Sequence, residues 1–289
     1  MKTLFHALAW LSLSSVLFAQ KPLTLAASAQ KVAKSMPRGC IVTGEWRDGK
    51  AVYAISGPDK PANVPAEKVV FEIGSISKVF TGLLLAQAVI EKKLTFETTL
   101  KQALDTKQAF ADEKVAAITL AQLATHTSGL PRMPDNADFT VADPYAAYDT
   151  KKLGDWLAGV KIDKAGPHDQ SYSNAGVAIL GHVIERALGD SWSNLVRDRI
   201  TKPLGMHDTM LVPTAEMRQR LAPPFDGKRG TRVDLPGLRT CRWIAQHGGG
   251  YDAFWSRFES PGVLAASRGH PARCEASHRG HWLLLFPWR

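Results

Sequence analysis

The stretch Phe71-Glu72-Ile73-Gly74-Ser75-Ile76-Ser77-Lys78 decides the fold, because it joins a short β-prone run to a long apolar helix predicted over residues 75–94. Ser75 and Lys78 are three residues apart at the start of that helix, so their side chains share one face. An amine can then reach a serine hydroxyl, which becomes a good nucleophile only when a neighbouring base takes its proton. The positive potential of the helix N-terminus favours an oxyanion there.

A serine and a lysine at this spacing also occur by chance, as a capped helix start with a solvated lysine. The apolar helix around Lys78 argues against that alternative, because an ammonium group buried without a partner is costly. The motif predicts that Ser75 is a nucleophile, and the partners that such a nucleophile needs must come from elsewhere in the chain.

A second motif, Ser171-Tyr172-Ser173-Asn174-Ala175-Gly176, lies just before another apolar helix, predicted over residues 174–188. Tyr172 can act as a general base or proton shuttle if a nearby cation lowers its pKa. Asn174 can hold Lys78 and a substrate amide. In the alternative interpretation, Asn174 only caps the helix and Tyr172 packs on its first turn.

Further elements are predicted from local patterns. Two β-prone runs, 40–46 and 51–56, flank Asp48-Gly49, which is a strong hairpin signal. Residues 69–73 form a third run, residues 118–124 and 191–200 read as helices, and residues 135–150 read as a loop.

Four segments together resemble the class C β-lactamase-like serine hydrolases, a group of β-lactamases, D-Ala-D-Ala carboxypeptidases and related esterases. They occur in the order Gly74-Ser75-Ile76-Ser77-Lys78, His126-Thr127-Ser128-Gly129-Leu130-Pro131, Tyr172-Ser173-Asn174 and Pro203-Leu204-Gly205-Met206. The resemblance runs from about residue 35 to about residue 238. It implies an α/β (α+β) fold, in which helices flank an antiparallel sheet and a mostly helical subdomain is inserted.

The resemblance also implies an acyl-enzyme mechanism without a metal or cofactor, acting on a β-lactam, a D-Ala-D-Ala peptide or an ester. Ser75 would be the nucleophile, and Lys78 its proton acceptor or electrostatic partner. Tyr172 would be the base that also protonates the leaving nitrogen, and Asn174 would position the substrate. His126 has a structural role in this interpretation, because the end of a helix suits a histidine that hydrogen-bonds the following turn.

The family's third motif, a Lys/His-Thr/Ser-Gly strand that supplies an oxyanion-hole N–H, is not found, and the C-terminal strands are expected to be missing. His247-Gly248-Gly249-Gly250 is only a superficial candidate, without a β-prone flank. Composition changes at the same place: residues 239–289 hold 7 Arg, no Lys and 4 of the 8 Trp.

A shift of reading frame after about residue 238 would explain both features. With plausible codons, shifting residues 241–254 by one base gives Ala-Gly-Gly-Ser-Leu-Ser-Thr-Ala-Ala-Asp-Met-Met-Arg-Phe, which resembles the family at this point. The chain would then be a catalytically dead, truncated remnant unless its frame is restored. The alternative is a genuine basic, Trp-rich tail that binds a membrane surface or a polyanion.

The N-terminus predicts export. Lys2 precedes an apolar run over residues 4–19, and Ala27-Ser28-Ala29 offers small residues for a signal peptidase. Cleavage after Ala29 is the first choice and cleavage after Ala19 the second. The run is shorter than the ~20 residues that span a bilayer. The predicted organisation is a signal peptide over 1–29, an incomplete hydrolase domain over 30–238 and an anomalous tail over 239–289, in a periplasmic protein without a stable membrane span.

The overall composition is globular, with 289 residues, 45% hydrophobic and 22% charged. A net charge of +9 suits a soluble basic protein and does not require nucleic acid. Three cysteines are too few and too scattered for a disulfide scaffold or a zinc site. The resemblance implies a small-molecule or peptidoglycan-derived substrate as the partner, and the expected oligomeric state is a monomer.

Overall fold

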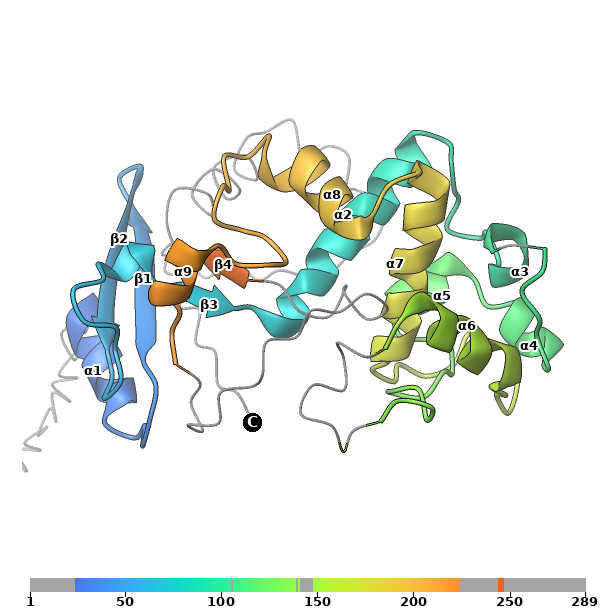
Figure 1. Cartoon of the computed structure of the whole chain (residues 1–289), viewed down its shortest axis with the longest axis horizontal. Coiled ribbons are helices and arrows are strands. Elements are labelled where there is room, and N and C mark those ends of the chain that lie inside the picture. The colour runs from blue at the N-terminus through green and yellow to red at the C-terminus, as the bar shows by residue number, and fades with distance from the viewer. Residues whose placement is uncertain (1–23, 105, 139, 141–147, 224–243, 247–289) are drawn as a thin grey trace, which may run out of the picture.

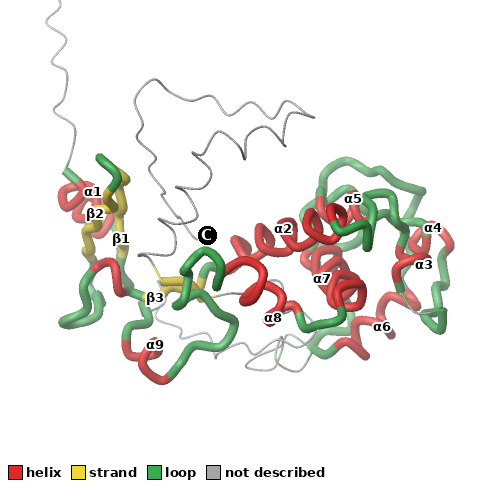
Figure 2. Tube along the Cα trace, turned by 90° about the horizontal axis from the view of Figure 1, so that it is seen from above, coloured by secondary structure: helices red, strands yellow, loops and turns green. Residues whose placement is uncertain are grey.

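The computed structural model describes residues 24–104, 106–138, 140, 148–223 and 244–246. The hairpin β1–β2 and helix α1 lie at one end of the molecule and a group of helices at the other, with β3 between them (Figures 1 and 2). The elements are α1 (Leu25–Ala33), β1 (Ile41–Arg47), β2 (Lys50–Ser56), η1 (Ala66–Lys68), β3 (Val70–Glu72), η2 (Gly74–Ile76), α2 (Ser77–Ile90), α3 (Leu100–Ala103), α4 (Glu113–Ala116), α5 (Leu120–Ala124), α6 (Thr150–Gly159), α7 (Asn174–Leu188), α8 (Trp192–Val196), η3 (Arg197–Thr201), α9 (Ala215–Gln219) and β4 (Ile244–Gln246).

The predicted hairpin is confirmed. Strands β1 and β2 pair antiparallel, and Arg47 is opposite Lys50 across the turn. Asp48 and Gly49 have φ values of 51° and 73°, the left-handed conformations that a tight two-residue hairpin turn requires. Asp and Gly tolerate these conformations better than most residues, which is why this dipeptide marks the turn.

Helix α1 packs against the hairpin (Figure 1). It includes Ala29, the predicted last residue of the signal peptide. Thr24 caps it by accepting a hydrogen bond from the Ala27 N–H at 3.2 Å, and Ala29 is fully buried. The Thr43 hydroxyl donates to the carbonyl of Leu25 at 3.1 Å. Cleavage after Ala29 would remove half of this helix. Residues 1–23 lie outside the described residues, and the signal peptide itself stays a prediction.

Strand β3 leads directly into the Ser75 segment and pairs antiparallel with β4. Val70 also forms a parallel bridge with Leu221. Strand β4 was not predicted: it lies within the segment assigned to the anomalous tail, immediately before His247-Gly248-Gly249-Gly250. The expectation that no strand flanks this run is therefore wrong, because β3 supplies backbone partners that the local sequence does not show. The rest of the tail lies outside the described residues.

The main hydrophobic core lies between α2, α5, α7 and α8. Helix α7 has the predicted bounds, with Ser173 as its N-cap and Gly189, at φ 73°, as its C-cap. Helix α2 is shorter than predicted, because its first turn is the 3₁₀ segment η2 and its end is at Ile90. A buried hydrogen bond from the Trp192 indole N–H to the Thr81 hydroxyl, 3.1 Å long, ties α8 to α2.

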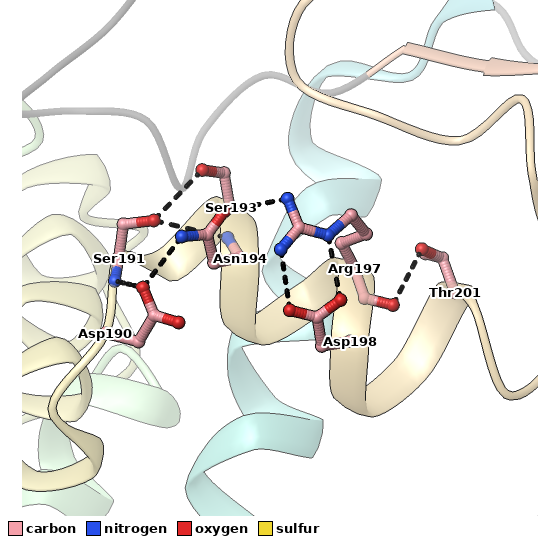
Figure 3. Close-up of polar contacts among 7 residues, drawn as sticks. All are labelled: Asp190, Ser191, Ser193, Asn194, Arg197, Asp198 and Thr201. Atoms are coloured by element: carbon pink, nitrogen blue, oxygen red, sulfur yellow. Dashed lines mark hydrogen bonds and ion pairs between the residues drawn. The ribbon is translucent and has the colours of Figure 1, made fainter.

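The predicted helix over 191–200 is α8 followed by the π-helical turn η3. A polar network runs along its exposed side (Figure 3). Asp190 accepts hydrogen bonds from the Ser191 N–H at 2.7 Å and from the Asn194 amide at 2.8 Å. The Arg197 guanidinium binds both carboxylate oxygens of Asp198, at 2.8 and 2.6 Å. Because these groups are exposed, the network adds little stability.

The fold is thus the predicted mixed α/β class, with antiparallel strand pairs and many helices. The sequence patterns used above did not predict the helices α1, α3, α4, α6 and α9. The predicted loop ends where α6 begins, at Thr150; residues 139 and 141–147 of it are outside the described residues. Among the described helices, none combines the length and hydropathy needed to cross a bilayer.

Candidate active site

The turn between β3 and α2 presents Ser75 to solvent. Gly74 has a φ of 51°, a left-handed conformation that favours glycine, and it starts the single 3₁₀ turn that contains Ser75. The Ile76 N–H donates to the Ile73 carbonyl at 3.1 Å and closes this turn. Gly74 and Ser77 are buried while Ser75 is exposed, so the turn holds the Ser75 hydroxyl outward at the N-terminal end of α2.

The three predicted residues Ser75, Lys78 and Tyr172 lie together. The Lys78 ammonium donates to Ser75 Oγ at 3.1 Å, which is the contact that their spacing on one helix face predicts. The Tyr172 hydroxyl donates to the same oxygen at 2.5 Å, across 97 residues of sequence. Lys78 is half-buried and Tyr172 is 36% exposed. One hydroxyl therefore has two proton-carrying partners and remains open to solvent.

The backbone around Tyr172 is fixed by His126, which follows α5. The Ser171 N–H donates to the His126 carbonyl at 2.8 Å, and the Ser173 N–H donates to His126 Nδ1 at 3.2 Å. His126 itself has a φ of 61°. His126 thus hydrogen-bonds the Tyr172 segment on both sides of the tyrosine, once through its backbone carbonyl and once through its imidazole, and this is the structural role expected of it.

Burial, and then the charge of Lys78, lower the pKa of His126 below its ordinary value. The imidazole is therefore neutral at neutral pH, and its Nδ1 is free to accept the Ser173 hydrogen bond. The His126 ring lies 4.6 Å from the Tyr172 ring, centroid to centroid. His126 supports the tyrosine as a neutral packing partner.

Asn174 is the first residue of α7, beside the site. Its backbone N–H donates to the Arg132 carbonyl at 2.9 Å, and its side-chain amide donates to Met133 Sδ at 3.3 Å. The capping residue is Ser173, whose hydroxyl accepts from the Gly176 N–H at 2.9 Å. The alternative in which Asn174 merely caps α7 is therefore wrong, and its role toward a substrate belongs to the proposals below.

Arg132 is a site residue that the sequence reasoning missed. Its guanidinium carbon lies 5.0 Å from the centroid of the Tyr172 ring, and Lys78 Nζ lies 4.9 Å from the same centroid. Two cations thus contact one aromatic ring. The available signal was a basic residue directly after Leu130-Pro131, in a motif already placed beside the site by the resemblance.

No group of three or more His, Cys, Asp or Glu side chains in the described part of the chain could hold a metal ion. The chemistry that this arrangement can perform is nucleophilic. Ser75 is an exposed hydroxyl at a helix N-terminus, with an amine and a phenol in hydrogen-bond contact, which is the pattern of an activated serine nucleophile.

The mixed α/β architecture and the cluster of serine, lysine and tyrosine are typical of serine hydrolases. Comparison with known proteins identifies the family. Residues 29–255 match the family described as Beta-lactamase, so the chain belongs to that family. The match begins within α1 and extends past residue 238 to include β4.

Two curated relatives illustrate the similarity. The chain is 35% identical over 163 residues to "Penicillin-binding protein 4" of Amycolatopsis lactamdurans, and the aligned region covers 56% of this chain and 41% of the relative. It is 31% identical over 169 residues to a "Beta-lactamase" of Providencia stuartii, covering 58% and 41% respectively. The chain thus spans less than half the length of these relatives.

Among solved structures, a β-lactamase/D-alanine carboxypeptidase from Yersinia pestis superposes with a TM-score of 0.64 at 22% identity. The superposition covers 81% of this chain and 66% of that one. At this identity the likeness establishes the fold.

Proposed function

We propose that this protein is a serine acyl-hydrolase whose nucleophile is Ser75. The observation that carries the proposal is the pair of hydrogen bonds on Ser75 Oγ, from Tyr172 at 2.5 Å and from Lys78 at 3.1 Å. The substrate is a β-lactam, a D-Ala-D-Ala peptide or an ester. The names of the relatives, a penicillin-binding protein and a β-lactamase, support an acyl donor of this kind.

In the acylation step, Ser75 Oγ bonds to the substrate carbonyl carbon and the carbonyl oxygen becomes an oxyanion. Ser75 must lose its proton as the bond forms, and only a deprotonated neighbour can take it. Tyr172 is the proposed acceptor, because its oxygen is the nearer of the two. For this step Tyr172 must first have lost its own proton, so that the 2.5 Å hydrogen bond then runs from the Ser75 hydroxyl to the Tyr172 oxygen. Lys78 then acts as the electrostatic partner of the developing charge.

Collapse of the tetrahedral intermediate breaks the bond from the carbonyl carbon to the leaving nitrogen or oxygen. Tyr172 returns the proton to that atom, and an acyl group remains on Ser75. Water then gives a proton to Tyr172 and attacks the acyl-enzyme carbon. The bond from that carbon to Ser75 Oγ breaks, Tyr172 passes the proton to Ser75, and the acid product leaves. Asn174, at the start of α7, is proposed to position the substrate beside this step.

The Ser75 N–H, at the N-terminal end of α2, is the proposed first donor to the oxyanion. The predicted signal peptide would place this site in the periplasm, where a peptidoglycan-derived substrate is available to it. Cleavage after Ala19 would leave α1 complete and the hairpin covered.

The test is covalent labelling of the full chain with a fluorescent penicillin, which acylates an active serine and stays bound if deacylation is slow. Label that is lost in Ser75→Ala supports the proposal. Wild-type protein that is folded by circular dichroism, takes up no label and turns over neither nitrocefin nor a p-nitrophenyl ester would show instead that the chain is a catalytically dead remnant.

A further inference from the structure

Arg132 is held at the rim of the candidate active site by its backbone. Its carbonyl accepts hydrogen bonds from the N–H groups of Asn174 at 2.9 Å and Ala175 at 3.3 Å, the first two residues of α7. These N–H groups have no partner within the helix, so Arg132 satisfies donors that would otherwise need water. The position of its Cα is therefore tied to the same helix start that positions Tyr172.

The side chain of Arg132 lies over the Tyr172 ring, with the guanidinium carbon 5.0 Å from the ring centroid. The hydroxyl of that ring contacts Ser75 Oγ, so one aromatic ring separates the guanidinium from the nucleophile. Stacking on an aromatic face orients the planar guanidinium without using its N–H groups. Those donors stay available to a ligand in the site.

Like Arg218 in α9, Arg132 has no carboxylate partner within the described residues, in contrast to four other arginines. Arg38, Arg197, Arg199 and Arg220 each pair with an aspartate or glutamate at 3.1 Å or less. Arg132 is exposed, and no ion pair or hydrogen bond from its guanidinium is formed within the described residues. An unpaired, oriented arginine beside a nucleophile is suited to an anion from outside the chain.

The local charge favours the same ligand. Lys78 contributes a second positive group, 4.9 Å from the Tyr172 ring centroid, and its field also lowers the pKa of the neighbouring His126. A carboxylate matches the fork of N–H donors that a guanidinium presents, and such charge-assisted pairs are among the stronger hydrogen bonds in proteins. A cationic substrate would be repelled by both groups.

We infer that Arg132 determines specificity by binding the carboxylate of an anionic acyl donor while Ser75 attacks its carbonyl. The inference rests on the proposed function, because it concerns acylation at Ser75. It predicts that the protein prefers a carboxylate-bearing substrate over its neutral ester, and that Arg132 is the source of this preference.

The experiment compares two probes that differ only in this charge: a fluorescent penicillin and its methyl ester. The second-order rate of Ser75 labelling is measured for wild type, Arg132→Gln and Arg132→Lys. In Arg132→Gln we expect the rate with the free acid to fall by roughly 10- to 100-fold, as for a lost hydrogen bond to a charged group, while the rate with the ester is retained. The rate of Arg132→Lys with the free acid should lie between those of wild type and Arg132→Gln, since lysine keeps the positive charge and loses the paired N–H donors of the guanidinium.

The matched control is Arg199→Gln, which removes a guanidinium that pairs with Glu91 at the far end of α2 from Ser75. It should leave the preference for the free acid unchanged. Equal loss with both probes in Arg132→Gln would mean that the arginine only supports Tyr172, and would overturn the inference. A wild type that labels equally with both probes would overturn it too. Absence of labelling by either probe would overturn the inference, and absence of p-nitrophenyl ester turnover as well would refute the proposed function itself.

Discussion

Replacing Tyr172 by phenylalanine removes one atom, the oxygen that lies 2.5 Å from Ser75 Oγ. The ring stays, and with it the contacts to His126 at 4.6 Å, Lys78 at 4.9 Å and Arg132 at 5.0 Å. Because Tyr172 is 36% exposed, its hydroxyl can exchange this hydrogen bond for water, and stability should change by no more than about 0.5 kcal/mol. Acylation should slow by about 10²–10⁴-fold, the range for a general acid–base group.

The matched control is Tyr148→Phe, which removes the same atom from a buried tyrosine outside the site. The Tyr148 hydroxyl donates to Asn136 Oδ1 at 2.8 Å, and the side chain is 1% exposed. Loss of this bond should cost about 0.5–1.5 kcal/mol of unfolding free energy and leave the acylation rate unchanged. The two variants should therefore show opposite patterns.

The assay measures the rate of labelling by a fluorescent penicillin and urea denaturation of the same preparations. A decrease below about tenfold in Tyr172→Phe would mean that the proton leaves Ser75 by another route. A large loss of stability in Tyr172→Phe would mean that the hydroxyl is structural, which would refute the reasoning from exposure.

Three further predictions follow from other contacts. In Gly129→Ala the new Cβ would overlap the His168 ring at a φ of 75°, so the unfolding free energy should fall by about 1–3 kcal/mol; an unchanged urea midpoint would contradict this. The pKa of His126 is lowered in the folded state, so the unfolded chain binds this proton more tightly and the associated stability is lost as pH falls below about 6.5. The stability difference between wild type and His126→Asn should therefore shrink on acidification, and a constant difference from pH 7 to 5 would argue against it. If the reading frame changes after residue 238, a version with the frame restored should acylate about 10²–10³-fold faster, the value of one oxyanion donor; equal rates would make the tail a genuine part of the protein.

Sequence patterns predicted the parts of the fold whose cause is local. Asp48-Gly49 specifies its hairpin through two left-handed residues, and α7 is bounded by its own cap residues, Ser173 and Gly189. Ser75 and Lys78 meet because three residues on a helix put them on one face. The contact from Tyr172 to Ser75 was reached through family resemblance, since no local rule joins residues 97 positions apart.

The features that the sequence did not predict depend on distant partners. Strand β4 exists through pairing with β3, far away along the chain. Helix α1 carries the small residues of the predicted cleavage site, and only its packing on the hairpin shows that Ala29 is buried. Arg132 reads as an ordinary surface residue until α7 and Tyr172 are placed around it.

The central claim is that Ser75 is acylated, and peptide mapping by mass spectrometry tests it most directly. The full chain is incubated with benzylpenicillin, digested with trypsin, and searched for a penicilloyl adduct. Residues 69–78 form one tryptic peptide that contains Ser75 and the fully buried Ser77. The account predicts one adduct, which fragmentation places on Ser75 and which is absent from Ser75→Ala. Folded protein without an adduct, or an adduct on another residue that persists in Ser75→Ala, would contradict it.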